Sequence, residues 1–166
     1  MSVSVYVGLG SNLDRENRLR RAVATLREQF GEVELSPVYD SAAVGFHGSD
    51  FLNLVARFDS GLEIESIVEI FHRIEDELGR DRSLPKFASR PIDLDILLYG
   101  DRIIDLPGIR TPRPEILENA FVLKPLQDLA PDLRHPESGE TFAVLWQRMS
   151  PDSPALDPFP LDFDES

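Results

Sequence analysis

Two periodicities of apolar positions alternate along the first part of the chain. Alternating or continuous apolar runs predict strands at residues 3–9, 33–39 and 51–58 and around Asp93 and Asp95. Helical spacing predicts two amphipathic helices, one that Asp14 caps and that ends at Gly31, and one over residues 63–78 that ends at Gly79. The predicted order is therefore strand, helix, strand, strand, helix, strand.

This order predicts an α+β fold, a ferredoxin-like βαββαβ antiparallel sheet with helices packed on it. Further helices are expected near residues 125–129 and 141–149, as an appended helical C-terminal part. We therefore expect one domain over residues 1–149. Residues 150–166 contain four prolines and five acidic residues but no basic one, which predicts an acidic, Pro-rich tail that is extended or disordered.

Charge narrows the possible partners. The 166 residues carry a formal net charge of −13, and nucleic acid or an anionic membrane surface would repel such a chain. The first residues show no basic segment followed by an apolar run, so we expect neither a signal peptide nor a membrane span. Cysteine is absent, which fits a reducing compartment. We expect a cytoplasmic monomer that acts on small molecules.

Asp93 and Asp95 stand at alternate positions in an otherwise apolar run from Ile92 to Leu98. Side chains alternate faces along a strand, so both carboxylates should lie on one face, with Cα atoms about 6.6 Å apart. Two like charges in a buried strand need a cation, and Mg²⁺ takes oxygen ligands together with substrate phosphates. We predict that both residues are metal ligands. The alternative, an exposed edge strand with solvated carboxylates, is disfavoured by the apolar neighbours.

Basic residues gather just before this strand, at Arg80, Arg82, Lys86 and Arg90. Such a cluster in so acidic a chain indicates a loop that binds an anion, and phosphates held near the aspartates would lie within its reach. A guanidinium matches phosphate oxygens bidentately, so Arg82 and Arg90 are predicted ligands ahead of Lys86. The alternative is a solvated surface loop.

A flat ligand is indicated by Phe51 and Asn53, which share one face of a predicted strand. An aromatic ring can stack on a planar heterocycle, and a neighbouring amide can both donate to its edge and accept from it. Phe121 offers a second ring. The alternative is that both phenylalanines belong to the core.

Glu75 falls inside the apolar stripe of the second predicted helix, and His72 lies at its border. An inward carboxylate needs a partner. Two interpretations stay open for Glu75: an anchor for an arginine or a metal-bound water, or a side chain that snorkels past the sheet edge. His72 is expected to be a boundary residue rather than a ligand.

Together these residues resemble the 6-hydroxymethyl-7,8-dihydropterin pyrophosphokinases of folate biosynthesis, over nearly the whole chain to about Met149. The segments that carry the resemblance are Gly8-Leu9-Gly10-Ser11-Asn12-Leu13, Phe51-Leu52-Asn53, Glu75-x-x-Leu78-Gly79-Arg80-x-Arg82, Arg90-x-x-Asp93-Leu94-Asp95-Ile96-Leu97-Leu98-Tyr99-Gly100 and Phe121-Val122-Leu123-x-Pro125-Leu126.

The resemblance implies transfer of a pyrophosphoryl group from ATP, the co-substrate, to the pterin hydroxymethyl oxygen, with release of AMP. It implies two Mg²⁺ ions at Asp93 and Asp95, and a pterin held by Phe51, Asn53 and Phe121. The residues that it assigns to the triphosphate are Arg80, Arg82 and Arg90. The expected catalytic residues are Arg82, Arg90, Asp93 and Asp95.

The chain departs from the family pattern on the nucleotide side. It has Pro112-Arg113 where the family usually has Pro-His, and Asn119 where an arginine is usual. We expect Arg113 to replace the missing charge and to bind ATP. Two alternatives stay open: a divergent paralogue with an altered pterin acceptor or weak activity, and a non-catalytic ferredoxin-like module that binds a nucleotide or pterin.

Overall fold

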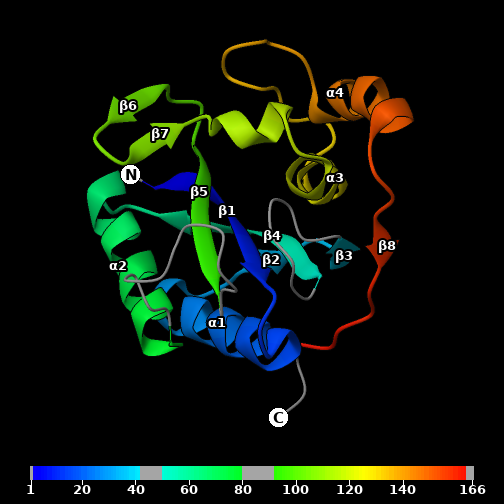
Figure 1. Ribbon diagram of the computed structural model, residues 1–166. Helices are drawn as coiled ribbons and strands as arrows, with labels where there is room; N and C mark the ends of the chain where they lie inside the picture. The colour runs from blue at the N-terminus through cyan, green and yellow to red at the C-terminus, as the bar shows by residue number, and fades with distance from the viewer. Residues whose placement is uncertain (1, 42–49, 80–91, 164–166) are drawn as a thin grey trace.

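The computed structural model describes residues 2–41, 50–79 and 92–163, and it confirms a mixed α/β architecture in which helices pack on an antiparallel sheet (Figure 1). The strands are β1 (Val3–Ser11), β2 (Glu34–Leu35), β3 (Tyr39–Ser41), β4 (Phe51–Ser60), β5 (Asp93–Tyr99), β6 (Ile104–Leu106), β7 (Ile109–Thr111) and β8 (Asp157–Pro158). The α-helices are α1 (Arg15–Phe30), α2 (Ile64–Glu77), α3 (Ala120–Leu129) and α4 (Phe142–Met149), and short 3-10 turns are η1 (Pro114–Leu117) and η2 (Ser150–Asp152).

The main sheet has the strand order β5-β1-β4-β3-β8, and β2 pairs with β4 beside β3. All of these pairings are antiparallel. The strand predicted over residues 33–39 is interrupted at Pro37, as its sequence indicates, and forms two short strands, β2 and β3, on either side of this proline. Proline has no N–H to donate to a ladder, which explains the interruption. A separate hairpin of β6 and β7 follows β5 and was not predicted.

Alternate side chains of β1 face two different cores. Val5, Val7 and Leu9 lie in a cluster with buried residues of α1 and α2. Tyr6 lies in a second cluster with residues of α3 and α4. Because successive side chains of a strand point to opposite faces, α1 and α2 cover one face of the sheet, and α3 and α4 cover part of the other (Figure 1).

Phe58 of β4 connects the sheet to both helices of the first core. Its ring stacks on Phe30 of α1 at a centroid distance of 3.9 Å and meets Phe71 of α2 edge-on at 6.3 Å. These two geometries are the ones that aromatic pairs favour. The cluster fixes α1 and α2 against the sheet, and it does so from the face opposite to the one on which Asn53 lies.

The ends of α1 follow the sequence prediction with one difference. Gly31 ends the helix with a φ of 85°, and its N–H donates to the Arg27 carbonyl at 2.9 Å. Asp14 precedes the helix as predicted, but its carboxylate accepts from the Asn17 amide at 3.0 Å instead of capping a helix N–H. In the described ranges, every helix is too short or too polar to cross a membrane.

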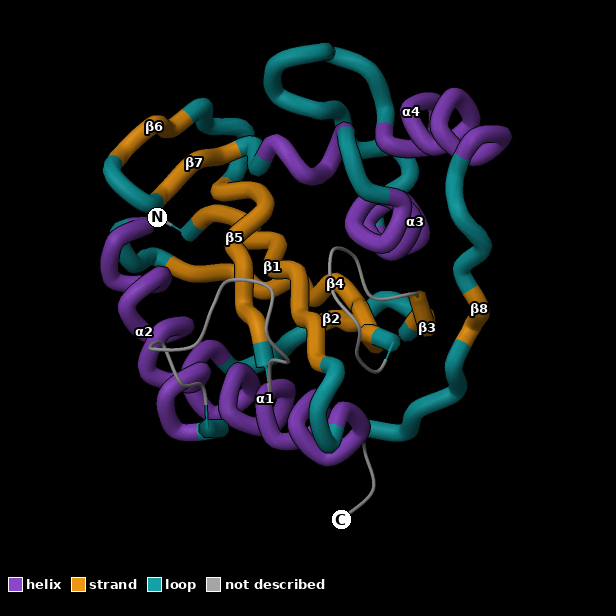
Figure 2. Tube along the Cα trace, viewed as in Figure 1, coloured by secondary structure: helices purple, strands orange, loops and turns teal. Residues whose placement is uncertain are grey.

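The tail after α4 runs along the molecule as extended chain and returns to α1 (Figure 2). Its strand β8 pairs with β3, and the Phe159 N–H donates to the Val38 carbonyl at 2.9 Å. Phe159, Leu161 and Phe163 are partly buried against the first core. The tail therefore adds a strand and three apolar side chains to the sheet edge.

His135 holds the loop between α3 and α4. Its ring is 2% exposed and meets Phe142 edge-on at 6.2 Å. The Nδ1 atom accepts the backbone N–H groups of Glu137 and Ser138, both at 3.1 Å. A protonated Nδ1 cannot accept, and burial further lowers the pKa of His135 below its ordinary value. The loop is therefore built around a neutral imidazole.

His135 should make folding stability depend on pH. Its pKa is lower in the folded state, so the unfolded chain binds more protons, and the contribution is complete above a pH of about 6.5 and declines as pH falls below it. The His135→Asn variant keeps an acceptor oxygen near the Nδ1 position but does not titrate. We expect the free energy of unfolding in urea to fall less between pH 7 and pH 5 for this variant than for the wild type. Equal losses would contradict the assignment.

Candidate active site

The strand register places two of the predicted site residues, Asp93 and Asn53, in one row across the sheet, with Gly10 between them. Gly10 of β1 pairs with Asp93 of β5 on one side and with Asn53 of β4 on the other. Cross-strand partners share a face, so the three residues lie on the face opposite to α1 and α2. With two strand spacings between them, Asp93 and Asn53 are separated by about 10 Å. Gly10 has no side chain, and the amide oxygen of Asn53 lies over it.

The second aspartate lies in the neighbouring row, where Asp95 pairs with Gly8. Each of the two aspartates thus has a glycine as its cross-strand neighbour on β1. Asp93 is half-buried, and the Asp95 side chain is 48% exposed, whereas Leu94 and Ile96 are buried. The expectation of buried carboxylates is therefore wrong in degree. β5 is at the edge of the described sheet, so solvent reaches its open face.

Glu75 of α2 lies beneath this pair. Its side chain is 4% exposed, and Oε2 accepts the backbone N–H of Leu94, between the two aspartates, at 2.9 Å. The snorkelling interpretation is wrong, because the carboxylate stays buried. The residue is an anchor for the strand backbone. His72 is exposed on α2, as expected for a boundary residue.

Arg113 comes to the same place from the segment after β7. Its backbone N–H donates to the Leu97 carbonyl of β5 at 3.0 Å. Its guanidinium lies 3.5 Å from the Asp95 carboxylate and also pairs with Glu115. Asp95 stands eighteen positions before Arg113 in the sequence, and the hairpin of β6 and β7 lies between the two residues.

The orientation of the Asn53 amide is set by a side chain that the sequence did not single out. Asn53 is 9% exposed, and its Nδ2 donates to the Ser41 hydroxyl of β3 at 3.1 Å. Its Oδ1 lies above Gly10, at 2.7 Å from the position that a Cβ there would take. The amide is thus fixed with one donor occupied and its oxygen toward the row of Asp93. Local pattern gave no signal for Ser41, because it meets Asn53 only through strand pairing.

The two predicted aromatic residues lie on elements that pack together. Phe51 opens β4 and Phe121 is in the first turn of α3, both half-buried, and α3 packs on β4 and β3. Tyr39 of β3 donates to the carboxylate of Asp128 on α3. Burial, and then this contact, raise the pKa of Tyr39 well above its usual value. The bond ties α3 to the strand beside Asn53.

The predicted phosphate ligands Arg80, Arg82 and Arg90, together with Lys86, lie outside the described residues. Within the described part of the chain, no group of three or more His, Asp or Glu side chains is arranged to hold a metal ion. Asp93 and Asp95 are the two carboxylates that the register of β5 places on this face.

The sequence profile of the 7,8-dihydro-6-hydroxymethylpterin-pyrophosphokinase (HPPK) family matches residues 6–131. The chain belongs to the HPPK family. Curated relatives named 2-amino-4-hydroxy-6-hydroxymethyldihydropteridine pyrophosphokinase agree with this. The one from Pseudomonas aeruginosa is 41% identical over 137 residues, which cover 80% of this chain and 84% of the relative. The one from Aquifex aeolicus is 37% identical over 136 residues, with the same coverage of 80% and 84%.

A solved structure shares the HPPK fold. Plasmodium falciparum HPPK-DHPS with pteroate superposes with a TM-score of 0.72 at 14% identity, and the match covers 92% of this chain. The match covers 44% of that longer chain. At this identity the likeness shows the fold alone.

Removal of the Glu75 carboxylate should weaken the strand that carries both aspartates. Glu75→Ala leaves the buried Leu94 N–H without this acceptor, and we expect the free energy of unfolding to fall by about 1–3 kcal/mol. Glu75→Gln keeps an acceptor oxygen and should lose less. Urea denaturation of both variants measures the difference, and equal losses would mean that the hydrogen bond to Leu94 is not what Glu75 contributes.

Proposed function

We propose that this chain transfers the pyrophosphoryl group of ATP to the hydroxymethyl oxygen of 6-hydroxymethyl-7,8-dihydropterin and releases AMP. Family membership supports the reaction. The single observation that carries it to this chain is the row in which Gly10 separates Asp93 from Asn53. Such a row offers carboxylates for the phosphate end of the reaction and an amide for the flat acceptor, with a residue that has no side chain between them.

The carboxylates of Asp93 and Asp95 fit a Mg²⁺ site, and we propose two ions there. They are hard oxygen donors on one accessible face, and Mg²⁺ is usually bound by one or two carboxylates while water and substrate phosphates complete its shell. When bound, Mg²⁺ would supply neutralisation of phosphate charge and activation of the attacking hydroxyl. Glu75 and the β1–β5 ladder hold the two aspartates in place.

At the acceptor end, we propose that Asn53 reads the edge of the pterin while Phe51 and Phe121 stack on its faces. Asn53 keeps its oxygen and one amide hydrogen for the ligand, since Ser41 takes the other hydrogen. A ligand fixed in this way presents its hydroxymethyl group to the phosphates, and positioning of the two reactants supplies much of the rate enhancement.

On the nucleotide side, we propose that Arg113 binds ATP phosphates, and that Arg80, Arg82 and Arg90 do so as their family positions imply. Arg113 already lies beside Asp95 and Glu115, so a guanidinium stands at the metal end of the row. When β2 and β3 are counted as two halves of one interrupted strand, the element order through β5 is βαββαβ, and this order and the sheet order β5-β1-β4-β3 support a ferredoxin-like topology for this domain.

Asp95→Asn should remove turnover. Mutation of a residue that only contacts a metal ligand typically lowers metal affinity or activity about 10–100-fold. Loss of a carboxylate ligand itself should therefore lower kcat by at least about 100-fold. AMP release from ATP, hydroxymethyldihydropterin and Mg²⁺ is the measurement, with Asp59→Asn as a control on β4, whose carboxylate is 57% exposed and pairs with Arg57. Full activity in Asp95→Asn would remove the basis of the proposed site. A wild type that releases AMP with another pterin but not with this one would favour the divergent paralogue.

Gly10→Ala should weaken binding of the acceptor without a large change in the stability of the fold. A Cβ at this position would lie 2.7 Å from Asn53 Oδ1, so the amide has to move away from Ser41. Because a side-chain end can move cheaply, we expect the melting temperature to change little and pterin affinity to fall about tenfold or more. Fluorescence titration with the pterin and thermal unfolding measure the two effects. Unchanged pterin affinity would show that Asn53 is not a ligand.

A further inference from the structure

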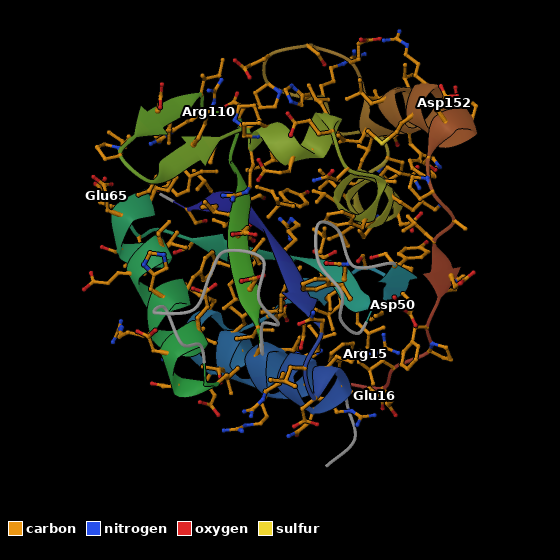
Figure 3. The ribbon with its side chains drawn as sticks, viewed as in Figure 1. Arg15, Glu16, Asp50, Glu65, Arg110 and Asp152 are labelled. Atoms are coloured by element: carbon orange, nitrogen blue, oxygen red, sulfur yellow. The ribbon has the colours of Figure 1, made fainter. Side chains whose placement is uncertain are left out.

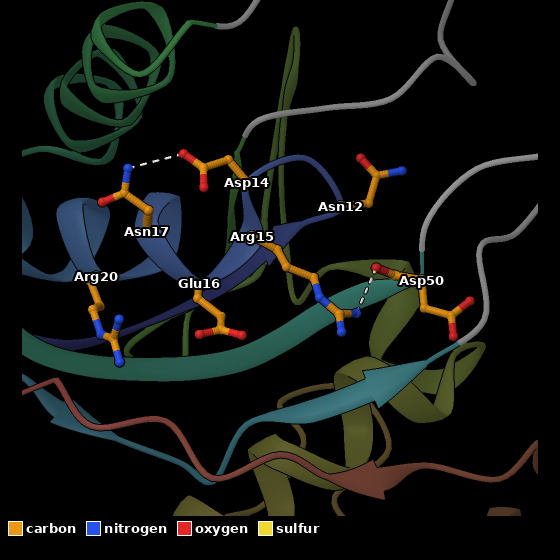
Figure 4. A pocket seen from close by; sticks show the side chains of 7 residues that line it. All are labelled: Asn12, Asp14, Arg15, Glu16, Asn17, Arg20 and Asp50. Atoms are coloured by element: carbon orange, nitrogen blue, oxygen red, sulfur yellow. Dashed lines mark hydrogen bonds between the residues drawn. The ribbon is translucent and has the colours of Figure 1, made fainter.

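Arg15, the first residue of α1, connects four segments of the chain. Its guanidinium donates to both oxygens of Asp40 on β3, at 3.0 and 3.2 Å. It also donates to the carbonyl of Asp50, the residue before β4, at 3.0 Å, and it lies over the Phe159 ring of the tail, 5.4 Å from the centroid. Arg15 and Asp50 line an open pocket at the start of α1, where Figure 4 shows their hydrogen bond.

The ion pair of Arg15 and Asp40 is more buried than an ordinary surface ion pair and has a defined orientation. The Arg15 and Asp40 side chains are 27% and 24% exposed, so both charges are largely removed from solvent. The pairing is bidentate, which fixes the direction of the guanidinium plane as well as its position. Figure 3 shows Arg15 and Asp50 next to each other, where the start of α1 meets the start of β4. Arg15 thus fixes β3 and the start of β4 relative to each other and to α1.

The same two strands determine where the Asn53 amide points. Asp40 pairs with Leu52, and Ser41 pairs with Phe51, one residue after Asp50. The bond from Asn53 to the Ser41 hydroxyl therefore depends on how β3 sits against the first residues of β4. A shift of β3 would turn or release the amide of Asn53. None of the hydrogen bonds of Arg15 named above goes to Asn53, so an effect of Arg15 on the amide would be indirect.

The tail completes the arrangement from the other side of β3. β8 pairs with Tyr39 and Asp40, and the Phe159 ring covers the guanidinium of Arg15. An aromatic face over a cation adds a favourable electrostatic contact and keeps water away from the ion pair. β3 is therefore held between β4 and β8, with Arg15 joined to all of these neighbours.

We propose that Arg15 is a positioning residue for the flat acceptor: it holds β3 against β4 so that Ser41 fixes the Asn53 amide in the orientation that binds the pterin edge. This inference rests on the proposed function, since it assigns to Arg15 a role in the same site. It separates Arg15 from residues that touch substrate, because Arg15 acts only through Asp40, Asp50 and Ser41.

Arg15→Gln tests the proposal. We expect the KM and the dissociation constant for the pterin to rise about tenfold, the scale of a small misplacement, while the KM for ATP and the kcat at saturating pterin stay within about twofold. Arg57→Gln is a matched control, because Arg57 lies on β4, is 26% exposed and pairs with Glu34 and Asp59 away from Asn53. The control should leave both KM values unchanged. Equal changes in the two KM values, or a change in kcat alone, would overturn the proposal.

Arg15→Lys is a second, more conservative variant, which keeps the test informative if Arg15→Gln does not fold. It keeps the charge but not the bidentate geometry, so it should give a smaller rise in the pterin KM than Arg15→Gln, at similar melting temperature. A melting temperature that falls without any rise in the pterin KM would show a purely structural role and would overturn the proposal.

Ser41→Ala and the double variant show whether Arg15 acts through Ser41. The effects of substitutions in one series of contacting residues are not additive. The double variant should therefore bind pterin about as weakly as whichever single variant has the lower pterin affinity. Additive losses would contradict the route through Ser41. Direct pterin binding and AMP release by the wild type are measured in parallel. If the wild type shows neither, the proposed function fails and this inference with it, whereas a competent wild type with an indifferent Arg15→Gln overturns this inference alone.

Discussion

The antiparallel register of β1 against both of its neighbours is the constraint on which the site depends. Because side chains alternate with a period of two, a slip of one residue would turn Asp93, Asp95 and Asn53 to the opposite face. The slip is prevented by the other half of the same strands, since Val5, Val7 and Leu9 are buried against α1 and α2. Hydrophobic burial on one face therefore specifies the polar arrangement on the other, and the glycines of β1 make that arrangement usable.

Much of this could be predicted from local pattern. The long strands β1 and β4 and the helices α1 and α2 follow from periodicity, and the alternation of Asp93 and Asp95 predicts their common face. The short pairings could not be predicted in this way, because β3, β8 and the hairpin of β6 and β7 are too short to show a period. The tail did carry a signal: Phe159, Leu161 and Phe163 alternate with proline and aspartate, the pattern of a chain with one buried side.

The candidate site divides along the same line. Residue chemistry indicated Asp93, Asp95, Asn53 and the inward carboxylate of Glu75 from the sequence, because each is a polar group at an otherwise apolar position. The partners of these groups were not predictable, since Glu75 binds a backbone N–H of β5 and Asn53 binds a hydroxyl of β3. The role of Arg15 could not be predicted from the sequence for the same reason. Nothing near it in the sequence distinguishes it from the other arginines of α1, and its partners come from β3, the start of β4 and the tail.

Glu75 has a consequence for the behaviour of this chain at high concentration. An edge strand with open N–H and carbonyl groups is a template onto which a strand of another molecule can add. On β5, the carboxylate of Glu75 accepts the N–H of Leu94, so this donor is not open to a strand of another molecule. At the opposite edge, β8 is short and contains Pro158, which has no N–H to offer. In the described sheet, each edge strand thus carries one feature that disfavours the addition of a strand from another molecule.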